Sequence, residues 1–312
     1  MKNKIGQKQV TIDPRRLAKV KCSICGSAQS KTLFHKEGFR FVRCANCGFV
    51  YVNPRLSDRE LKRFYESSDM YWSAQDSAQV RGLLKKKFDD ELARIERHIP
   101  KGRVLDVGCA AGVFLYHARA RGWQVAGAEH SKGAREYLKS ELGMEQIYPG
   151  ELTKLKPRSF DLVTMHQVLE HSPNPDRMVA QGGRLLREGG LLFISVPNTK
   201  GITGRIMGQE CGHYVGDVHL SYFSRKDLRV LLERNGFEII GFATESFMAE
   251  PLLAYIKSKA LFWKPQQPQT LDTGTTKRRE QSRLMFHAYY AICAVLNAFA
   301  LGDYFNVLAR KK

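Results

Sequence analysis

Short apolar runs alternate with amphipathic stretches from residue 103 onward, and this alternation predicts strands and helices in turn. The runs typical of buried strands are 104–107, 124–128, 146–148, 160–165 and 191–196. Helices are expected to begin near Gly112, Gly133 and Pro175, and a helix at 225–235 with strands at 237–244 and 304–309 completes the pattern. The sequence therefore predicts an α/β fold in which helices cover both faces of a parallel sheet.

The N-terminal part of the chain is patterned differently. Residues 22–52 are rich in turns and include β-like runs such as 39–43, whereas 58–66 and 79–99 have helical spacing. The longer helix carries an apolar stripe formed by Leu83, Leu84, Phe88, Leu92, Ile95 and Ile99. A turn at 100–102, Pro-Lys-Gly, is expected to end this helix.

Four cysteines in the N-terminal part have the spacing of a zinc site. They form two C-x2-C pairs with 18 residues between them, and a glycine follows each pair: Cys22, Cys25, Cys44 and Cys47. Two thiolates from one tight turn can bind one ion, and Gly26 and Gly48 permit the backbone of such turns. Four thiolates complete a tetrahedron, so the sequence predicts a closed, structural Zn²⁺ site.

A glycine-rich turn follows the first strand of the predicted sheet. The run RVLDVGCAAGVFL resembles the D-x-G-C-x-x-G loop of the class I S-adenosylmethionine (SAM)-dependent methyltransferases. Asp106, Gly108 and Gly112 match that loop, whereas Ala110 stands where many members carry glycine. Glycines let a backbone approach a ligand closely. The resemblance implies that the parallel sheet is the Rossmann-like sheet of these enzymes, and that this loop, Cys109 included, binds SAM.

The second strand ends in Glu129, 23 residues after Asp106, and His130 follows it. A carboxylate at this position can accept hydrogen bonds from both ribose hydroxyls of a nucleotide cofactor. A dehydrogenase would share the glycine turn and this carboxylate. These two features alone therefore leave both enzyme classes open.

The run SFDLVTMHQVLEHSPNP separates the two classes. It resembles the fourth-strand motif of the same methyltransferase group, whose members often carry FD, LEH and P in this order. The resemblance implies that His166 and Gln167 lie beside the methionine part of SAM, and that Glu151 and Leu152 meet its adenine. Two further blocks extend the resemblance, which covers about residues 79–248 and the final strand.

Proton removal from an acceptor needs a base, and the segment after the fifth predicted strand supplies candidates. Residues 198–222 contain five glycines and several polar side chains, which predicts a hinged lid over the pocket. We expect His219 to be the base, because only histidine titrates near neutral pH without help, and Asp217 to orient it from an extended strand. The competing candidates are His213, Tyr222 and His171.

The expected activity is methyl transfer from SAM to a hydroxyl or carbon of a small-molecule, sugar or lipid-linked acceptor. The chain lacks the [DN]-P-P-[YF] motif after its fourth strand, which disfavours the methyltransferases that act on exocyclic amino groups of bases. A zinc-ribbon-containing RNA methyltransferase and a non-catalytic SAM-binding scaffold stay open as alternatives.

The charge distribution adds a preference for anionic partners. Residues 1–87 hold 19 Lys and Arg against 7 Asp and Glu, which is +12 of a total formal charge of +19. Such a surface suits a phosphorylated or nucleotide-linked acceptor, RNA or an acidic membrane, and it also serves solubility alone. The sequence starts without an apolar leader and has no run of about 18 apolar residues, so the cytoplasm is the expected compartment.

These patterns together predict the domain organisation. We expect a zinc-binding module at 1–57, a helical linker at 58–102, a SAM-binding core at 103–248, a helical insertion at 249–302 with a mobile loop at 264–282, and the last strand at 303–312. Within the insertion, 277–301 starts with three basic residues and is apolar around most of its circumference. Such a helix is buried, in a homodimer interface for example, or lies at the inner face of a membrane.

Overall fold

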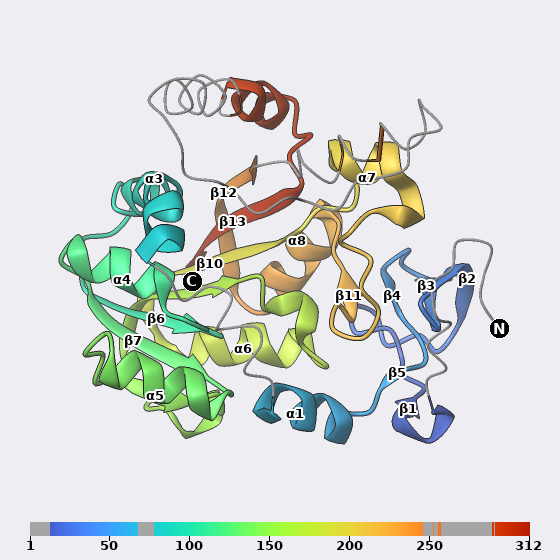
Figure 1. Ribbon diagram of the computed structural model, residues 1–312, viewed down its shortest axis with the longest axis horizontal. Helices are drawn as coiled ribbons and strands as arrows, with labels where there is room; N and C mark the ends of the chain where they lie inside the picture. Colours follow the sequence, from blue (N-terminus) through green and yellow to red (C-terminus); the bar gives the residue numbers. More distant parts are fainter. Residues whose placement is uncertain (1–12, 68–77, 246–251, 253–254, 257–288, 290) are drawn as a thin grey trace, which may run out of the picture. The chain divides into compact units, whose positions relative to one another are not determined.

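A computed structural model of the protein describes residues 13–67, 78–245, 252, 255–256, 289 and 291–312 (Figure 1). The chain divides into two units, each made of segments that are distant in the sequence. The first comprises the residues up to 196 together with 215–242 and 306–312. The second comprises 197–214 and 243–305.

A seven-stranded sheet forms the centre of the first unit, in the order β12-β13-β10-β9-β6-β7-β8. The bounds are β6 Arg103–Val107, β7 Gln124–Glu129, β8 Ile147–Pro149, β9 Phe160–His166, β10 Leu186–Pro197, β12 Phe237–Glu245 and β13 Tyr304–Lys311. β6 pairs in parallel with both β7 and β9, and β7–β8 and β9–β10 are also parallel. All seven predicted strands are present, within a few residues of their expected bounds.

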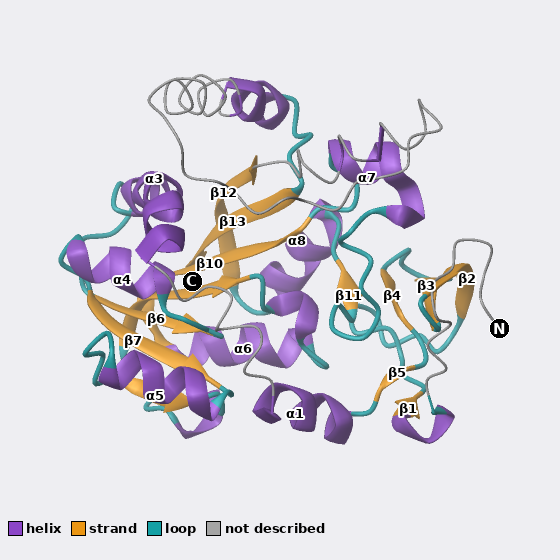
Figure 2. Cartoon of the chain, viewed as in Figure 1, coloured by secondary structure: helices purple, strands orange, loops and turns teal. Residues whose placement is uncertain are grey.

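Helices cover both faces of this sheet, as the alternating pattern predicts (Figure 2). One layer contains α3 Ala78–Ile95, α4 Val113–Ala120 and α5 Lys132–Ser140, and the other contains α6 Pro175–Leu185 and α8 Arg225–Arg234. An apolar cluster joins Phe88, Leu92 and Ile95 of α3 to Phe114 and Leu115 of α4. Right-handed crossovers place the helices of successive βαβ units on opposite faces when the strand order reverses.

The predicted stripe on α3 is only partly correct. Phe88, Leu92 and Ile95 are buried, but Leu83 is 61% exposed. Leu83 lies one residue before the half-buried Leu84, so it points about 100° away around the helix and faces solvent. The helix also ends at Ile95, four residues before the expected end, and a turn carries the chain to the buried Ile99.

The N-terminal module forms a second, four-stranded sheet in the order β11-β4-β3-β2. Its strands are β2 Ser30–Lys36, β3 Phe39–Cys44, β4 Val50–Val52 and, from much later in the chain, β11 Ser221–Tyr222. A short ribbon of β1 Leu17–Ala18 with β5 Arg55–Leu56 precedes helix α1 Asp58–Ser67. β11 thus joins residues predicted for a lid to the cysteine module.

The second unit contains helix α7 Ile202–Met207, the short turn η4 Gly208–Glu210 and a helical stretch at 291–298. Asp303 fixes the start of α7, because its Oδ1 accepts the Thr203 amide at 3.1 Å. Ile292, Val295 and Phe299 are exposed apolar residues of the second unit. Among the described residues, no helix is long and apolar enough to span a bilayer. The predicted mobile loop at 264–282 lies outside the described residues, and so do 277–288 and 290 of the predicted helix at 277–301.

Candidate active site

A cavity of about 540 Å³ opens at the carboxyl ends of β6, β7 and β9. The chain runs from β6 to β7 on one side and later returns to β9 on the other side of β6. Such a reversal of strand order leaves a crevice outside the strand ends, which is where open α/β sheets bind ligands. The predicted site residues that line it are Asp106, Gly108, Cys109, Ala110, Glu129, His130, His166, Gln167, His171 and His219.

The backbone of the turn after β6 lines the cavity. Gly108 has a φ of 68°, and a Cβ there would lie 2.6 Å from Val168 Cγ2, so a side chain would have to displace Val168. Ala110 also has a positive φ, of 45°. This left-handed conformation costs roughly 1–2 kcal/mol for a residue with a Cβ, which explains why glycine suits this position in related loops.

Glu129 connects two loops at the cavity wall. Its Oε2 accepts the Ala110 amide at 3.0 Å, and its Oε1 accepts the Ser131 amide at 2.8 Å. These two bonds hold the carboxylate in one orientation. Because each carboxylate oxygen has two lone pairs, both oxygens can still accept a hydroxyl donor from the cavity.

Asp106, His166 and Glu91 form a buried charged network below the same wall. Asp106 Oδ1 accepts a hydrogen bond from Thr164 Oγ1 at 2.7 Å and lies 3.2 Å from His166 Nδ1, while His166 Nε2 lies 2.7 Å from Glu91 Oε1. Burial lowers the pKa of His166, but the charges of Glu91 and Asp106 and the hydrogen bonds to them raise it to about 10. The imidazole is therefore a cation at neutral pH.

A second group of polar side chains lies across the cavity, on η3 Leu169–His171 and on the segment before β11. The rings of His171 and His219 meet edge to face with centroids 4.8 Å apart, and Tyr65 Oη lies 3.0 Å from His171 Nδ1. Burial lowers the pKa of His171 to about 3, and it raises the pKa of the adjacent Glu170 to about 8. Ligand atoms of Glu170, His171 and His219 all lie within 4.8 Å of one another, so this group could hold a cation.

Other predicted site residues lie away from this cavity. Gly112 begins α4 beneath Leu138, Leu152 is buried at the start of η2 Leu152–Lys154, and Glu151 lines a separate hollow beside Arg103. Tyr222 is buried on β11 with its ring 5.6 Å from that of Phe41. His213 belongs to the second unit, where it is buried with its ring 5.1 Å from that of Tyr304.

The expectation that Asp217 precedes His219 on an extended strand is wrong. Residues 216–218 form a turn, the His219 amide donates to the Val215 carbonyl at 2.8 Å, and the Asp217 side chain is exposed. The chain reaches β11 only at Ser221. His219 is held instead through its neighbour, because Leu220 donates to the Glu170 carbonyl and accepts from the Val52 amide.

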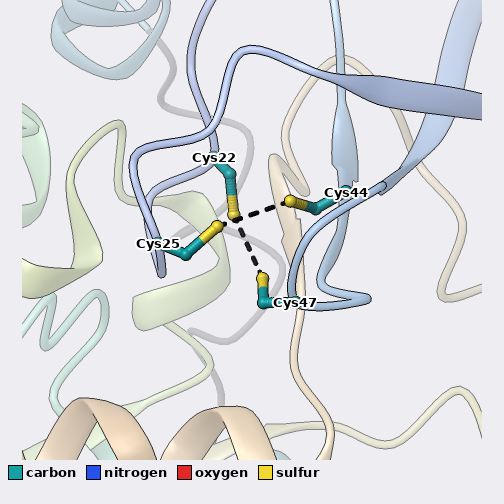
Figure 3. A group of neighbouring side chains, drawn as sticks. All are labelled: Cys22, Cys25, Cys44 and Cys47. Carbon is teal, nitrogen blue, oxygen red and sulfur yellow. Dashed lines mark hydrogen bonds between the residues drawn. The ribbon is translucent and has the colours of Figure 1, made fainter.

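The four cysteines of the N-terminal module converge on one point (Figure 3). Cys22 Sγ lies 3.6 Å from Cys47 Sγ, and Cys25 Sγ lies 3.5 Å from Cys44 Sγ. Four sulfurs at about 2.3 Å from a zinc ion would lie about 3.8 Å apart. Gly26 and Gly48 have φ of 75° and 83°, the conformation expected for the two knuckles. The cluster has the dimensions of a tetrahedral metal site.

The comparison with known families decides between the two enzyme classes. Residues 78–241, more than half of the chain, match a family described as methyltransferase domain. The chain belongs to this family. The match confirms the resemblance to SAM-dependent methyltransferases and excludes the dehydrogenase interpretation.

Two curated relatives of this methyltransferase domain are ubiquinone biosynthesis O-methyltransferases. The protein from Hahella chejuensis is 30% identical over 163 residues, which are 48% of this chain and 67% of the relative. The protein from Alkalilimnicola ehrlichii is 28% identical over 164 residues, 50% of this chain and 66% of the relative. The chain thus spans about two thirds of the length of these relatives.

Solved structures confirm the predicted fold class. A SAM-dependent methyltransferase from Archaeoglobus fulgidus matches with a TM-score of 0.50 at 17% identity, over 78% of this chain and all of that one. Magnesium protoporphyrin IX methyltransferase from Synechocystis PCC 6803, solved with bound SAH, also matches with a TM-score of 0.50, at 15% identity over 82% of this chain. The sheet and its helices are therefore those of a Rossmann-like methyltransferase.

Three residues at or next to the methyltransferase cavity were not predicted from the sequence: Glu91, Glu170 and Tyr65. Glu91 has a visible signal, because it is a carboxylate on the buried face of α3, between Phe88 and Leu92. A carboxylate on an apolar face is rarely buried without a partner. Tyr65 has no comparable signal in the sequence, since its contact with His171 joins residues 106 positions apart.

Proposed function

We propose that the protein transfers a methyl group from SAM to a hydroxyl of a small-molecule, sugar or lipid-linked acceptor. One observation carries the proposal. A single cavity has the glycine turn and Glu129 on one wall, and the imidazoles of His171 and His219 on another. This arrangement can hold a nucleoside cofactor at the strand ends and remove a proton from an acceptor opposite it.

The cavity fits SAM in size and in chemistry. Its volume of about 540 Å³ falls within the usual range of roughly 300–1,000 Å³ for cofactor sites. We assign the ribose hydroxyls to Glu129, the backbone approach to Gly108 and Ala110, and the methionine part to Asp106, His166 and Gln167. SAM supplies a methyl group on a sulfonium, and the chain's own residues orient the donor and keep water out.

The assignment of Glu129 gives the first prediction. Glu129→Ala removes two charge-assisted hydrogen bonds to the ribose, so SAM affinity should fall by about 2–3 kcal/mol. Calorimetric titration of the folded variant measures this loss. Glu136→Ala on the exposed face of α5 is the matched control and should bind SAM normally. Unchanged SAM affinity in Glu129→Ala would remove Glu129 from the cofactor site.

We call the cavity wall that carries His171 and His219 the acceptor wall. We assign proton removal to His219. Its ring lies against that of His171 at the cavity, whereas Tyr222 and His213, two competing candidates, are outside the residues that line it. His171 is the less suitable base, because burial lowers the pKa of its imidazole to about 3. An alcohol needs such a base more than an amine does, since an amine is already nucleophilic when neutral.

The identity of the acceptor requires a direct experiment. Formation of S-adenosylhomocysteine should be screened against nucleotide sugars, lipid-linked glycans, quinone precursors and RNA. Turnover on a small or lipid-linked alcohol supports the proposal, and turnover on RNA alone would favour the zinc-ribbon RNA methyltransferase instead. SAM binding without turnover on any class would favour a non-catalytic scaffold. Membrane contact and dimerisation through 277–301 stay predictions.

We further propose that the four-cysteine cluster binds one structural zinc ion. Its four sulfurs close a tetrahedron, so the site has no open position for substrate. The N-terminal module, which contains the four cysteines, supports the acceptor wall. Its strand β4 pairs with β11, and the Val52 amide donates to the carbonyl of Leu220, next to His219. The phenyl rings of Phe49 and Phe223, 5.4 Å apart, add an apolar contact.

This assignment gives the second prediction. The purified protein should contain about one zinc per chain, and Cys44→Ser should lose most of it. Turnover should then fall further than SAM affinity, because β11 is held by the module whereas the cofactor wall belongs to the large sheet. Cys293→Ser, a buried cysteine outside the cluster, should retain zinc. Metal analysis of both variants is the measurement, and full zinc in Cys44→Ser contradicts the assignment.

A further inference from the structure

The acceptor wall holds three metal-ligand side chains apart from the four cysteines. Glu170, His171 and His219 each offer one ligand atom, and these atoms all lie within 4.8 Å of one another. Two imidazoles and one carboxylate are a donor set that binds divalent transition metals such as Fe²⁺ and that leaves open positions for other ligands. We propose that these three side chains bind one divalent cation at the acceptor position.

Glu170 is the strongest reason for a cation here. Its side chain is 1% exposed, and neither carboxylate oxygen finds a hydrogen-bond partner among the residues that the structure describes. Burying a carboxylate without hydrogen bonds or an opposite charge is costly, and native proteins rarely keep such a group without a purpose. A cation bound to Glu170 would stabilise the ionised carboxylate in this buried position.

His171 is oriented as a metal ligand. Its Nε2 faces Glu170 Oε1 at 4.0 Å, whereas its Nδ1 lies 3.0 Å from Tyr65 Oη. Metal-binding histidines usually donate their other ring N–H to an oxygen, which fixes the tautomer and leaves the ligating nitrogen its lone pair. A His171 Nδ1–H that donates to Tyr65 leaves Nε2 available to the cation.

The backbone keeps the third ligand close to the first two. Leu220, next to His219, donates its amide to the Glu170 carbonyl at 2.8 Å. With metal–ligand distances of about 2.0–2.2 Å, ligand atoms around a bound ion would lie about 3 Å apart. The side chains must therefore approach by roughly 1–2 Å, a movement that side-chain torsions can supply while the backbone bond stays in place.

This inference deepens the proposed function and rests on it only for the acceptor. His171 and His219 line the cavity, so an open coordination position would face an acceptor hydroxyl. A cation lowers the pKa of a hydroxyl bound to it, and the proton can then leave to solvent. His219 would then aid proton removal as a ligand of the cation instead of taking the proton itself.

Binding of Mn²⁺ to the full chain tests the proposal without SAM or acceptor. Mn²⁺ favours oxygen and nitrogen over thiolate ligands, so zinc-loaded cysteines should not compete for it. Electron paramagnetic resonance should detect one bound Mn²⁺ per chain, at least tenfold weaker binding in Glu170→Gln and in His219→Ala, and normal binding in the exposed-residue controls Glu188→Gln and His98→Ala. Mn²⁺ should also raise the melting temperature of the wild type more than that of Glu170→Gln.

The proposal is overturned if the wild type binds no stoichiometric Mn²⁺, or if Glu170→Gln binds it equally well. Glu170→Gln keeps the shape of the side chain and replaces a carboxylate oxygen by an amide nitrogen that cannot bind a cation, and near-ultraviolet circular dichroism will verify that it folds. The two proposals fail separately. If the chain binds Mn²⁺ but transfers no methyl group, only the proposed function is contradicted. If it transfers methyl groups but binds no Mn²⁺, only the proposed cation site is contradicted.

Discussion

Replacing His219 by alanine should lower the rate of methyl transfer by about two to four orders of magnitude, the usual contribution of a group that moves a proton in the transition state. The expectation holds whether the imidazole accepts the proton itself or binds a cation that acidifies the hydroxyl. SAM affinity should change little, because Glu129 and the glycine turn lie on the other wall. The variant thus separates cofactor binding from chemistry.

The measurement is single-turnover formation of S-adenosylhomocysteine on the acceptor found in the screen, with SAM affinity measured in parallel. His98→Ala is the matched control, since His98 is exposed in the turn after α3, where its backbone amide donates to the Ile95 carbonyl and its backbone carbonyl accepts from Arg310. Near-normal turnover in His219→Ala would show that this histidine is not needed for proton removal. Equal loss of SAM affinity and turnover would place it in cofactor binding instead.

The parts of this site that the sequence predicts are those built by neighbouring residues. The turn after β6 and the carboxylate at the end of β7 each follow directly from a strand with a recognisable apolar pattern. Parallel pairing of β6 with β7 then brings Asp106 opposite Gly127 and carries both strand ends to one edge. Local pattern and sheet geometry together therefore suffice to place Glu129 beside the glycine turn.

The remaining contacts depend on tertiary packing between distant parts of the chain. Glu91 contacts His166, which is 75 residues later in the chain. The Val52 amide donates to the carbonyl of Leu220, 168 residues later, next to the pairing of β4 with β11. Neither helical nor strand periodicity carries this information. The turn at 216–218 shows the same limit, because the hydrogen bond from His219 to Val215 overrides the extended conformation expected for Asp217.

Replacing His166 by leucine should lower the free energy of unfolding by about 3–5 kcal/mol, because it leaves two buried carboxylates without their shared cation. Glu91 is completely buried and Asp106 is 4% exposed. The rings of Phe88, Phe114 and Phe193 surround the imidazole with centroids 4.6–5.5 Å away, so leucine fits an apolar environment of similar size. The loss should therefore come from charge more than from packing.

Urea unfolding of a double-mutant cycle, at pH 7 and as a function of pH, tests this account. Removing both partners in Glu91→Leu/His166→Leu should cost less than the sum of the two single changes. The pKa of His166 is about 10 in the folded protein against 6.5 for a free histidine, so the folded chain binds this proton more tightly. The extra stability of the wild type over His166→Leu should be fully present below pH 6.5 and should decline as the pH rises towards 10. Additive energies, or a difference that grows with pH, would show that His166 is neutral in the folded protein.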